Sequence, residues 1–379
     1  MKFSAQSKSL YSCVSAVSKV INSKNALTVL NNFLFTLSGN ELTIKASDME
    51  HSLVGRIDVT DAEGEGSFCL DAHRIVDLLK EMPAQGMTFE VNDENLETVI
   101  TYPNGRYDTV AIAGNEYPRM ETEDPEAVNE TFVVSTNQVL RGIENTIFAV
   151  GTDDLRPQMM GILWDIKPDR IVFVATDTRK LVKYTDSAIK PECECSFILP
   201  LKAANVLKNV FAKETTVNVR LSHKSVTFTS ANFVFNCRLI KGMFPDYNRV
   251  IPPSNPNIVT LDRQNFINAI RRVTVFGNDG NGLVIFKLSE DQLQLRASDT
   301  SYGTSGRETV SCSYTGTPLT IGFSAPYILE IFNTISTTDV IMKLADQSRP
   351  AVCVPDENEP DTELLIILMP MNIVDTANI

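Results

Sequence analysis

The stretch IVFVATDTRKLV, residues 171–182, contains a tripeptide that returns twice elsewhere in the chain. An alanine, a serine or threonine, and an aspartate occur at 46–48, 175–177 and 297–299. Each tripeptide follows a run of alternating apolar residues, which is typical of a half-buried strand, and leads into a second, polar strand. The sequence therefore predicts the same β-hairpin at three places.

Features on both sides of the hairpins repeat with a period of about 125 residues. Apolar side chains at helical spacing precede each hairpin, and a strand that runs directly into a second helix follows each one. These strand–helix segments are SFCLDAHRIVDLLKEM at 67–82, SFILPLKAANVLKNVF at 196–211 and IGFSAPYILEIFNTI at 321–335. Apolar–proline pairs close the three copies, at 117–118, 244–245 and 369–370. A period of this length is that of a domain and not of a solenoid repeat.

We therefore predict an α+β fold of three similar domains, each with two helices and antiparallel sheets. The domains are placed at residues 1–121, 129–250 and 257–379. The connecting text is acidic and contains proline at 121–129, and it reads PPSNP at 252–256. Both stretches are typical of short linkers.

The distribution of charge leaves two interpretations of the surface open. The 379 residues have a formal net charge of −13, which ordinarily argues against a nucleic-acid partner. Acidic residues concentrate in turns and linkers, at 61–66, 92–97, 121–126 and 356–361. The predicted helices instead carry cations on their polar faces: Lys8, Lys19, Arg74, Lys80, Arg141, Lys202, Lys208, Lys213, Arg271 and Arg272. If the helices share one side, that side is positive; otherwise these cations are ordinary solvated charges.

Composition predicts a globular protein that does not enter a membrane. Apolar residues make up 43% of the chain and charged residues 21%, which is ordinary for such proteins. No apolar run is long enough to cross a bilayer and MKFSAQSKSL lacks a signal-peptide core, so we expect a cytoplasmic protein. The seven cysteines form an odd number without a CxxC pair, which indicates neither a disulfide framework nor a zinc site.

The sequence contains no recognisable catalytic constellation. No phosphate-cradling or nucleophile-elbow motif occurs. The three histidines lie in different segments without chelating spacing: His51, His73 and His223. Asp48, Asp177 and Asp299 occupy the same turn of each copy, which favours carboxylates that accept backbone N–H bonds over carboxylates that bind Mg²⁺ or transfer protons. We therefore predict no catalytic residues, no metal and no cofactor.

Several stretches together resemble a known family. They are the N-terminal MKF, ATDTRKLV at 175–182, KGMFPDYNRV at 241–250 and LMPMNI at 368–373. With the triple repeat, they closely resemble the beta subunit of bacterial DNA polymerase III, the sliding clamp, over essentially the whole chain. The resemblance implies the DNA clamp fold, in which helices line the inside and sheets lie outside, and a ring-shaped, head-to-tail homodimer around double-stranded DNA. Such a clamp is not an enzyme; it tethers the replicative polymerase for processive synthesis.

The resemblance also implies three sets of site residues by position. Sequence-independent DNA contacts on the inner wall would come from Lys24, Arg74, Arg156, Gln158 and Lys202. The dimer interface would consist of Tyr107, Thr109, Val110, Val275 and Phe276. Of these, Tyr107 and Phe276 are also plausible as plain core residues. A pocket for short linear motifs of the polymerase catalytic subunit, the clamp loader and repair proteins would be formed by Met159, Thr176, Thr178, Arg179, Lys180, Leu181, Pro245, Arg249, Val250, Ile367, Leu368, Met369, Pro370 and Met371.

Three departures from the family pattern concern the pocket and the end of the chain. Thr178-Arg179-Lys180 stands where Gly or Ser, His and Arg are commoner, so one pocket wall is bulkier and more basic. Asn372 replaces a basic residue that is usual in the family, and VDTANI continues the chain beyond Ile373. These differences bear on the expected ligand preference and leave ring formation untouched.

Two other classes of function remain open from the residues. An enzyme, such as a nucleotide-processing hydrolase, would use Asp177 or Asp299 with a metal, and lost turnover on substitution would reveal it. A scaffold that binds peptides without encircling DNA would sediment as a monomer.

Overall fold

The computed structural model describes residues 1–379 except 23, 121–127, 279, 281 and 374–379. Most of the predicted linker at 121–129 and the VDTANI tail therefore lie outside the described residues. Among the described residues, no helix is both long and apolar enough to span a bilayer.

The chain repeats one order of elements three times: a strand, a helix, a run of strands, a second helix and further strands. This is the order predicted from the spacing of the three hairpins. The first helices of the repeats are α1 (Ser7–Val17), α3 (Thr136–Thr146) and α5 (Arg263–Thr274). The second helices are α2 (Ala72–Lys80), α4 (Leu201–Val210) and α6 (Ala325–Thr334).

The helices form where apolar residues recur at helical spacing. The residues that define the apolar stripe of α1 are buried, as the periodicity predicts: Leu10, Cys13, Val14 and Val17. An aspartate caps two of the helices by accepting a backbone N–H of the first turn. Asp71 accepts from Arg74 at 2.9 Å before α2, and Asp262 accepts from Asn265 at 2.7 Å before α5. These caps fix the residues at which both helices begin.

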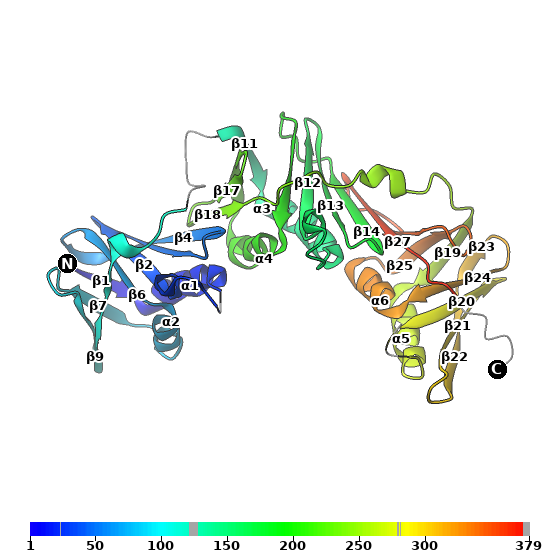
Figure 1. The fold of residues 1–379 in the computed structure, drawn as a ribbon, viewed down its shortest axis with the longest axis horizontal. Coiled ribbons are helices and arrows are strands. Elements are labelled where there is room, and N and C mark those ends of the chain that lie inside the picture. The colour runs from blue at the N-terminus through cyan, green and yellow to red at the C-terminus, as the bar shows by residue number, and fades with distance from the viewer. Residues whose placement is uncertain (23, 121–127, 279, 281, 374–379) are drawn as a thin grey trace. The chain divides into compact units, whose positions relative to one another are not determined.

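The described chain forms two compact units, residues 1–140 with 202–239 and residues 141–201 with 240–379. Each unit contains one nine-stranded antiparallel sheet and one smaller sheet (Figure 1). The first nine-stranded sheet has the order β10 (Ile112–Ala113), β6 (Gly66–Asp71), β2 (Asn32–Ser38), β3 (Glu41–Ser47), β4 (His51–Asp58), β18 (Phe233–Arg238), β17 (Ser225–Thr229), β16 (Thr216–Ser222) and β11 (Val128–Ser135). The second has the order β15 (Cys195–Pro200), β12 (Gly161–Lys167), β13 (Arg170–Thr176), β14 (Lys180–Asp186), β27 (Thr362–Leu368), β26 (Ala351–Pro355), β25 (Asp339–Leu344), β19 (Asn257–Asp262) and β23 (Ser313–Thr315). Each large sheet therefore joins strands of two repeats.

Each of the two smaller sheets ends in a strand that, among the described residues, pairs on one side only. The first unit contains β5 (Thr60–Glu63), β1 (Lys2–Gln6), β7 (Gly86–Val91), β8 (Glu97–Tyr102) and β9 (Gly105–Val110), in that order. The second unit contains β22 (Thr304–Ser311), β21 (Gln292–Asp299), β20 (Leu283–Ser289) and β24 (Leu319–Ser324). In the repeat, β9 corresponds to β18 and β27, while β22 corresponds to β4 and β14. The strands that pair between repeats elsewhere are therefore edge strands in these two sheets.

The first and central repeats meet where β4 pairs with β18, a junction that we call the first seam. His51 lies opposite Cys237 in this pairing. The packing of α1 on β4 leaves no room for a side chain at Gly55, because an added Cβ would lie 2.4 Å from Sγ of Cys13. Burial raises the pKa of the Cys13 thiol to about 12.

The central and third repeats meet where β14 pairs with β27, the second seam. Lys180 lies opposite Leu368, and Val182 lies opposite Ile366. Lys180 follows its hairpin aspartate by three residues, just as His51 does at the first seam. The two seams are therefore built with the same register relative to their hairpin turns.

Candidate functional site

The three hairpin aspartates have the same role in the structure. One carboxylate oxygen of each accepts the backbone N–H groups two and three residues further on. The distances are 3.0 and 2.7 Å at Asp48, 2.9 and 2.8 Å at Asp177, and 2.7 and 3.3 Å at Asp299. The interpretation of these residues as turn aspartates is confirmed. Among the described residues, no group of three or more His, Cys, Asp or Glu side chains is arranged to hold a metal ion.

Each hairpin turn also contains a residue with a left-handed backbone. The φ angles are +74° at Met49, +76° at Thr178 and +66° at Gly303. A β-branched residue fits this region poorly, so Thr178 is strained by about 1–2 kcal/mol. Gly or Ser is commoner at this position in the family that the sequence resembles, and the strained Thr178 lies on a cavity wall.

A buried cation connects the central hairpin to α6 at the second seam. The ammonium of Lys180 lies 2.9 Å from Asp177 Oδ2 and 2.9 Å from Glu330 Oε2, and 4.1 Å from the ring centre of Tyr327. Its side chain is only 5% exposed. Burial lowers the pKa of Lys180, but the hydrogen bonds and charges of Asp177 and Glu330 outweigh it and raise the pKa above its ordinary value. The cluster fixes the hairpin turn against the third repeat.

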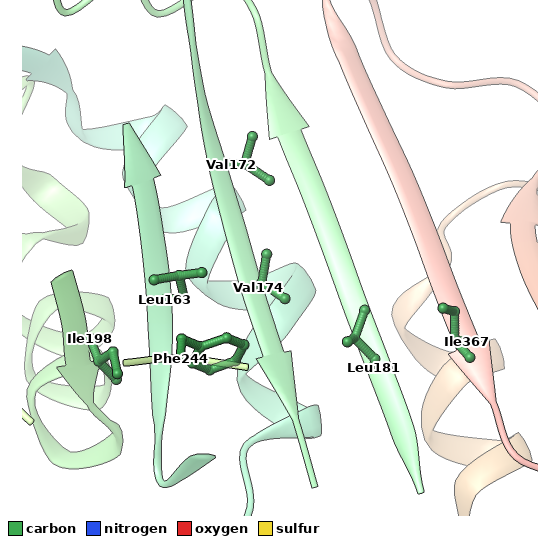
Figure 2. Close-up of a cluster of buried hydrophobic side chains, with 7 residues drawn as sticks. All are labelled: Leu163, Val172, Val174, Leu181, Ile198, Phe244 and Ile367. Atoms are coloured by element: carbon green, nitrogen blue, oxygen red, sulfur yellow. The ribbon is translucent and has the colours of Figure 1, made fainter. Parts of the chain in front are cut away.

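A cavity of about 200 Å³ opens beside this hairpin. It lies over a cluster of buried apolar side chains that comes from five strands and from Phe244, which follows β18 (Figure 2). The cluster consists of Leu163, Val172, Val174, Leu181, Ile198, Phe244 and Ile367. The residues lining the cavity are Met159, Thr176, Thr178, Arg179, Lys180, Leu181, Phe244, Pro245, Asp246, Tyr247, Val250, Ile367 and Met369. An apolar floor with polar groups at the rim suits a ligand that inserts apolar side chains.

Ten of the fourteen residues predicted for the pocket line this cavity. The other four do not line it. Leu368 is buried in β27, Pro370 is half-buried, and Met371 bridges to Gly322 in β24. The side chain of Arg249 is 85% exposed and lies 3.0 Å from the carboxylate of Asp246.

The prediction missed three lining residues, all within the FPDY text that supported the resemblance. Phe244 packs into the floor, and Asp246 and Tyr247 line the wall. The Tyr247 hydroxyl donates to Asp165 at 2.8 Å, and burial together with this bond raises its pKa to about 12. The aromatic residues and the proline of this FPDY text were the signal in the sequence that could have added these residues to the predicted pocket.

The residues predicted to contact DNA differ in how freely their side chains are available. Lys24, Arg74 and Arg156 are exposed, and Gln158 is half-buried. The ammonium of Lys202 donates to the backbone oxygen of Val20 at 2.6 Å, to Asn22 Oδ1, and to Asp48 Oδ2 at 2.7 Å. The structure thus places Lys202 in a bridge across the first seam.

That bridge stabilises the charged form of Asp48. Burial disfavours an ionised carboxyl there, but His51 and Lys202 outweigh it and hold the pKa of Asp48 well below its usual range. His51 Nδ1 lies 3.1 Å from the same carboxylate. Each seam therefore has a hairpin aspartate with a cation beside it.

The residues predicted for a dimer interface lie at the free edges. Tyr107 and Val110 on β9 are 41% and 67% exposed, and Thr109 between them is half-buried. Val275 and Phe276, directly after α5, are 76% and 49% exposed. Tyr107 and Phe276 are therefore surface residues in this chain, and the alternative that they fill the core is wrong.

Comparisons with known proteins agree with the repeated architecture. Models of the N-terminal, central and C-terminal domains of the DNA polymerase III beta subunit match residues 1–121, 133–246 and 248–372. The chain is 27% identical over 375 residues to the beta sliding clamp of Pseudomonas aeruginosa, which covers 98% of this chain and 100% of the relative. The beta sliding clamp of Haemophilus influenzae is 27% identical over 376 residues with the same coverage.

Solved structures give the same result for the fold. A crystal structure of the Pseudomonas aeruginosa DNA polymerase sliding clamp with ligand has a TM-score of 0.92 at 26% identity, covering 98% of this chain and 100% of that chain. A structure of the same organism's clamp bound to griselimycin matches equally well. The DNA polymerase III beta subunit of Thermotoga maritima has a TM-score of 0.90 at 24% identity and covers 98% of this chain and 99% of that chain. The three-domain clamp fold is therefore shown for this chain.

Proposed function

Because the chain belongs to the DNA polymerase III beta subunit family, we propose that it is a sliding clamp that encircles duplex DNA. Two copies close head to tail into a ring, which tethers the replicative polymerase during processive synthesis. The ring acts in the cytoplasm, without catalytic activity, metal or cofactor of its own. Its three domains are those placed at 1–121, 129–250 and 257–379.

The observation that carries the proposal is the repeated seam. Two of the three possible junctions between a β4-type strand and a β18-type strand are formed inside the chain, at β4–β18 and β14–β27. The third pair, β22 and β9, is present as two free edges. A free edge is an aggregation hazard that natural proteins cover. Pairing β22 of one copy with β9 of the next covers both edges and gives a closed, head-to-tail assembly.

Exposed apolar residues beside these edges support the same pairing. Tyr107 and Val110 supply apolar surface on β9, and Val275 and Phe276 supply it next to β22. Gly306 of β22 lies against Val273 and Phe276, and its lack of a side chain lets the end of α5 pack closely on this edge strand. We therefore assign Tyr107, Thr109, Val110, Val275 and Phe276 to the dimer interface.

The ring would hold DNA by enclosure and not by tight binding. Lys24, Arg74, Arg156 and Gln158 would contact phosphates without reading sequence, and Lys202 contributes less because its hydrogen bonds are already made. A small number of phosphate contacts suits sliding, because each contact must break before the ring can move along the DNA.

The cavity at the second seam would dock partner proteins. Its apolar floor accepts side chains of short linear motifs from the polymerase, the clamp loader and repair proteins, and Met159 and Met369 give it a deformable surface. Arg249 lies nearby, exposed, and would hold an acidic group of the motif outside the cavity. A single shared cavity implies that these partners exchange by competition.

Enclosure is tested by loading the protein on nicked circular DNA and washing with high salt. A clamp stays on the circle and is released when the circle is linearised, because it then slides off the ends. Release that follows salt equally on both DNA forms would rule out enclosure. A Tyr107→Asp variant, which places a charge on the β9 edge, should sediment as a monomer and be lost from both substrates.

A further inference from the structure

The apolar cluster beneath the cavity of about 200 Å³ has a counterpart beside the first seam. We call the two groups of side chains the second-seam cluster and the first-seam cluster. The first-seam cluster lies wholly in the first unit and the second-seam cluster wholly in the second. The first-seam cluster consists of three buried residues, Leu30, Cys69 and Tyr117, and of four half-buried residues that pack against them, Val29, Leu34, Met49 and Ile112.

The two clusters correspond position by position. Residues of the first-seam cluster and their counterparts in the floor or wall of the cavity are Leu30 and Met159, Leu34 and Leu163, Cys69 and Ile198, Ile112 and Ile240, and Tyr117 and Phe244. The first three pairs are 129 residues apart, which is also the offset between the two hairpin aspartates. In the fourth pair, Ile112 lies opposite Cys69, and the backbone N–H of Ile240 donates to Ile198 at 3.2 Å. Both residues of the last pair directly precede a proline.

The residue directly after the hairpin aspartate differs between the two seams. Met49 and Thr178 both occupy this position, and both have a left-handed backbone, with φ angles of +74° and +76°. The side chain of Met49 packs against the first-seam cluster. Thr178 is exposed and lies on the wall of the open cavity. A methionine therefore covers the first-seam cluster, where a shorter side chain leaves the second-seam cluster accessible.

The methionine at the first seam indicates which kind of group fits on such a cluster. Methionine is apolar, unbranched and flexible, so it adapts to an irregular apolar surface. A cavity of about 150 Å³ with apolar walls is large enough to hold benzene. The cavity of about 200 Å³ at the second seam therefore has room for a side chain as large as that of methionine, leucine or phenylalanine.

We propose that the side chain directly after the hairpin aspartate controls whether a seam can dock a partner. Thr178 keeps the cavity at the second seam open and limits the size of the apolar side chain that a partner inserts. Met49 is the built-in occupant of the equivalent place and closes the first seam to partners. The proposal rests on the docking role of the cavity and adds the residue that sets its selectivity.

Backbone strain and filling of the cavity predict opposite effects for one substitution at this position. Thr178→Met replaces a β-branched residue by an unbranched one, which relieves strain at a positive φ. Met49 already has the same backbone conformation, so the substituted chain can fold. If strain decided ligand binding, the variant would bind a peptide at least as tightly as the unmodified protein. If filling decides it, the new methionine occupies the cavity and the peptide is excluded.

The test measures peptide binding by fluorescence anisotropy and stability by thermal unfolding. The probe is a labelled, acetylated peptide with two adjacent large apolar side chains. Thr178→Met should bind it about tenfold more weakly or worse, and its melting temperature should not fall below that of the unmodified protein. Lost binding in a chain of undiminished stability separates a filled cavity from a misfolded one. The matched control at the first seam is Met49→Gly, which leaves the cavity unaltered and should bind the peptide like the unmodified protein.

A series of side chains of increasing size at position 178 provides a second measurement. Thr178→Gly and Thr178→Ser enlarge the cavity, so a peptide that carries tryptophan at one of its two apolar positions should gain affinity relative to one that carries leucine there. We expect this ratio of affinities to rise about fivefold from threonine to glycine, with serine between them. The series keeps the test informative if Thr178→Met is unstable.

Three results would overturn the proposal. The first is an unchanged peptide affinity in Thr178→Met. The second is an equal loss of affinity in Met49→Gly, because the peptide would then dock at the first seam. The third is a ratio of tryptophan to leucine affinity that does not change with the size of residue 178.

The unmodified protein separates this result from the docking function itself. If the unmodified protein binds neither peptide, the docking role of the cavity is wrong. If it binds them and Thr178→Met binds equally well, only the role of Thr178 is wrong.

Discussion

The two seams are built alike, yet the side chains beside them differ. Both pair a hairpin strand with a strand of the next repeat in the same register, and both place a cation beside the hairpin aspartate. Beside the helices, the first seam has a wide groove lined by four cations without a carboxylate partner among the described residues, and the second has a small cavity lined by the Arg141–Glu359 pair. The shared backbone therefore fixes the strand pairing, and a few side chains set the size and charge of the space beside each seam.

The face of the second large sheet that carries the cavity of about 200 Å³ also differs from its counterpart at the first seam. Val172 and Val174 line the buried cluster of the central repeat, and the residues 129 positions earlier, Thr43 and Lys45, are only half-buried. Leu181 corresponds in the same way to Ser52, which is buried but polar. An apolar floor is thus present at the second seam, where the equivalent face at the first seam is polar. The comparison teaches that copies of one module can keep the same strand pairing and differ in the polarity of the same face of the sheet.

The largest effect is expected from breaking the buried cluster at the second seam. Lys180→Ala leaves Asp177 and Glu330 facing each other without their cation, which should lower the free energy of unfolding by about 3 kcal/mol. Urea titration followed by fluorescence measures this loss. Lys183→Ala, on the same strand with a looser pair at 3.9 Å, should cost less than about 1 kcal/mol. Equal losses would mean that the cluster does not stabilise the seam.

The next effect concerns the docking floor. Leu181→Ala removes apolar contacts from the cavity, so a short acetylated peptide with two adjacent large apolar side chains should bind about tenfold more weakly. Fluorescence anisotropy with the labelled peptide measures the change. Ser52→Ala alters the equivalent position of the first seam and should leave the affinity unchanged. A similar loss from both variants would place the peptide elsewhere.

The smallest effect is a pH dependence at the first seam. The pKa of Asp48 is lower in the folded than in the unfolded chain, so the ionised carboxylate adds to the free energy of unfolding. This stabilisation is fully present above the unfolded pKa of about 3.9 and is lost as the pH falls below that value. Asp48→Asn should therefore cost about 1–2 kcal/mol at pH 7, and this difference should shrink as the pH is lowered below about 4. Thermal unfolding at several pH values measures it. Asp169→Asn, at an exposed pair, should give a small difference at every pH.

The sequence predicted those parts of the molecule that local pattern determines. The repeat placed all three hairpins and both helices of each copy, and the aspartate turns followed from residue type alone. The apolar residues of the pocket could be placed because a family resemblance supplied the long-range neighbours that periodicity lacks.

Contacts between residues that are distant in the chain could not be predicted from the sequence. Lys202 was predicted to contact DNA, but its ammonium bridges to Asp48, 154 positions away. Met371 was assigned to the pocket, but its backbone pairs with Gly322. Whether a surface cation is paired depends on such contacts, so the sequence could name Lys8 among the helix cations but could not show that it lines a groove together with Arg56.

Because α1 packs closely on the first seam, two native thiols there can report when the paired strands separate. Cys13 packs against Gly55, and Cys237 lies opposite His51 with its side chain fully buried. Burial raises the pKa of both thiols, and an alkylating reagent reacts with the thiolate form of a cysteine. Neither thiol is therefore expected to react while the strands stay paired. The rate at which these cysteines are alkylated would therefore measure how frequently the first seam opens, without any engineered probe.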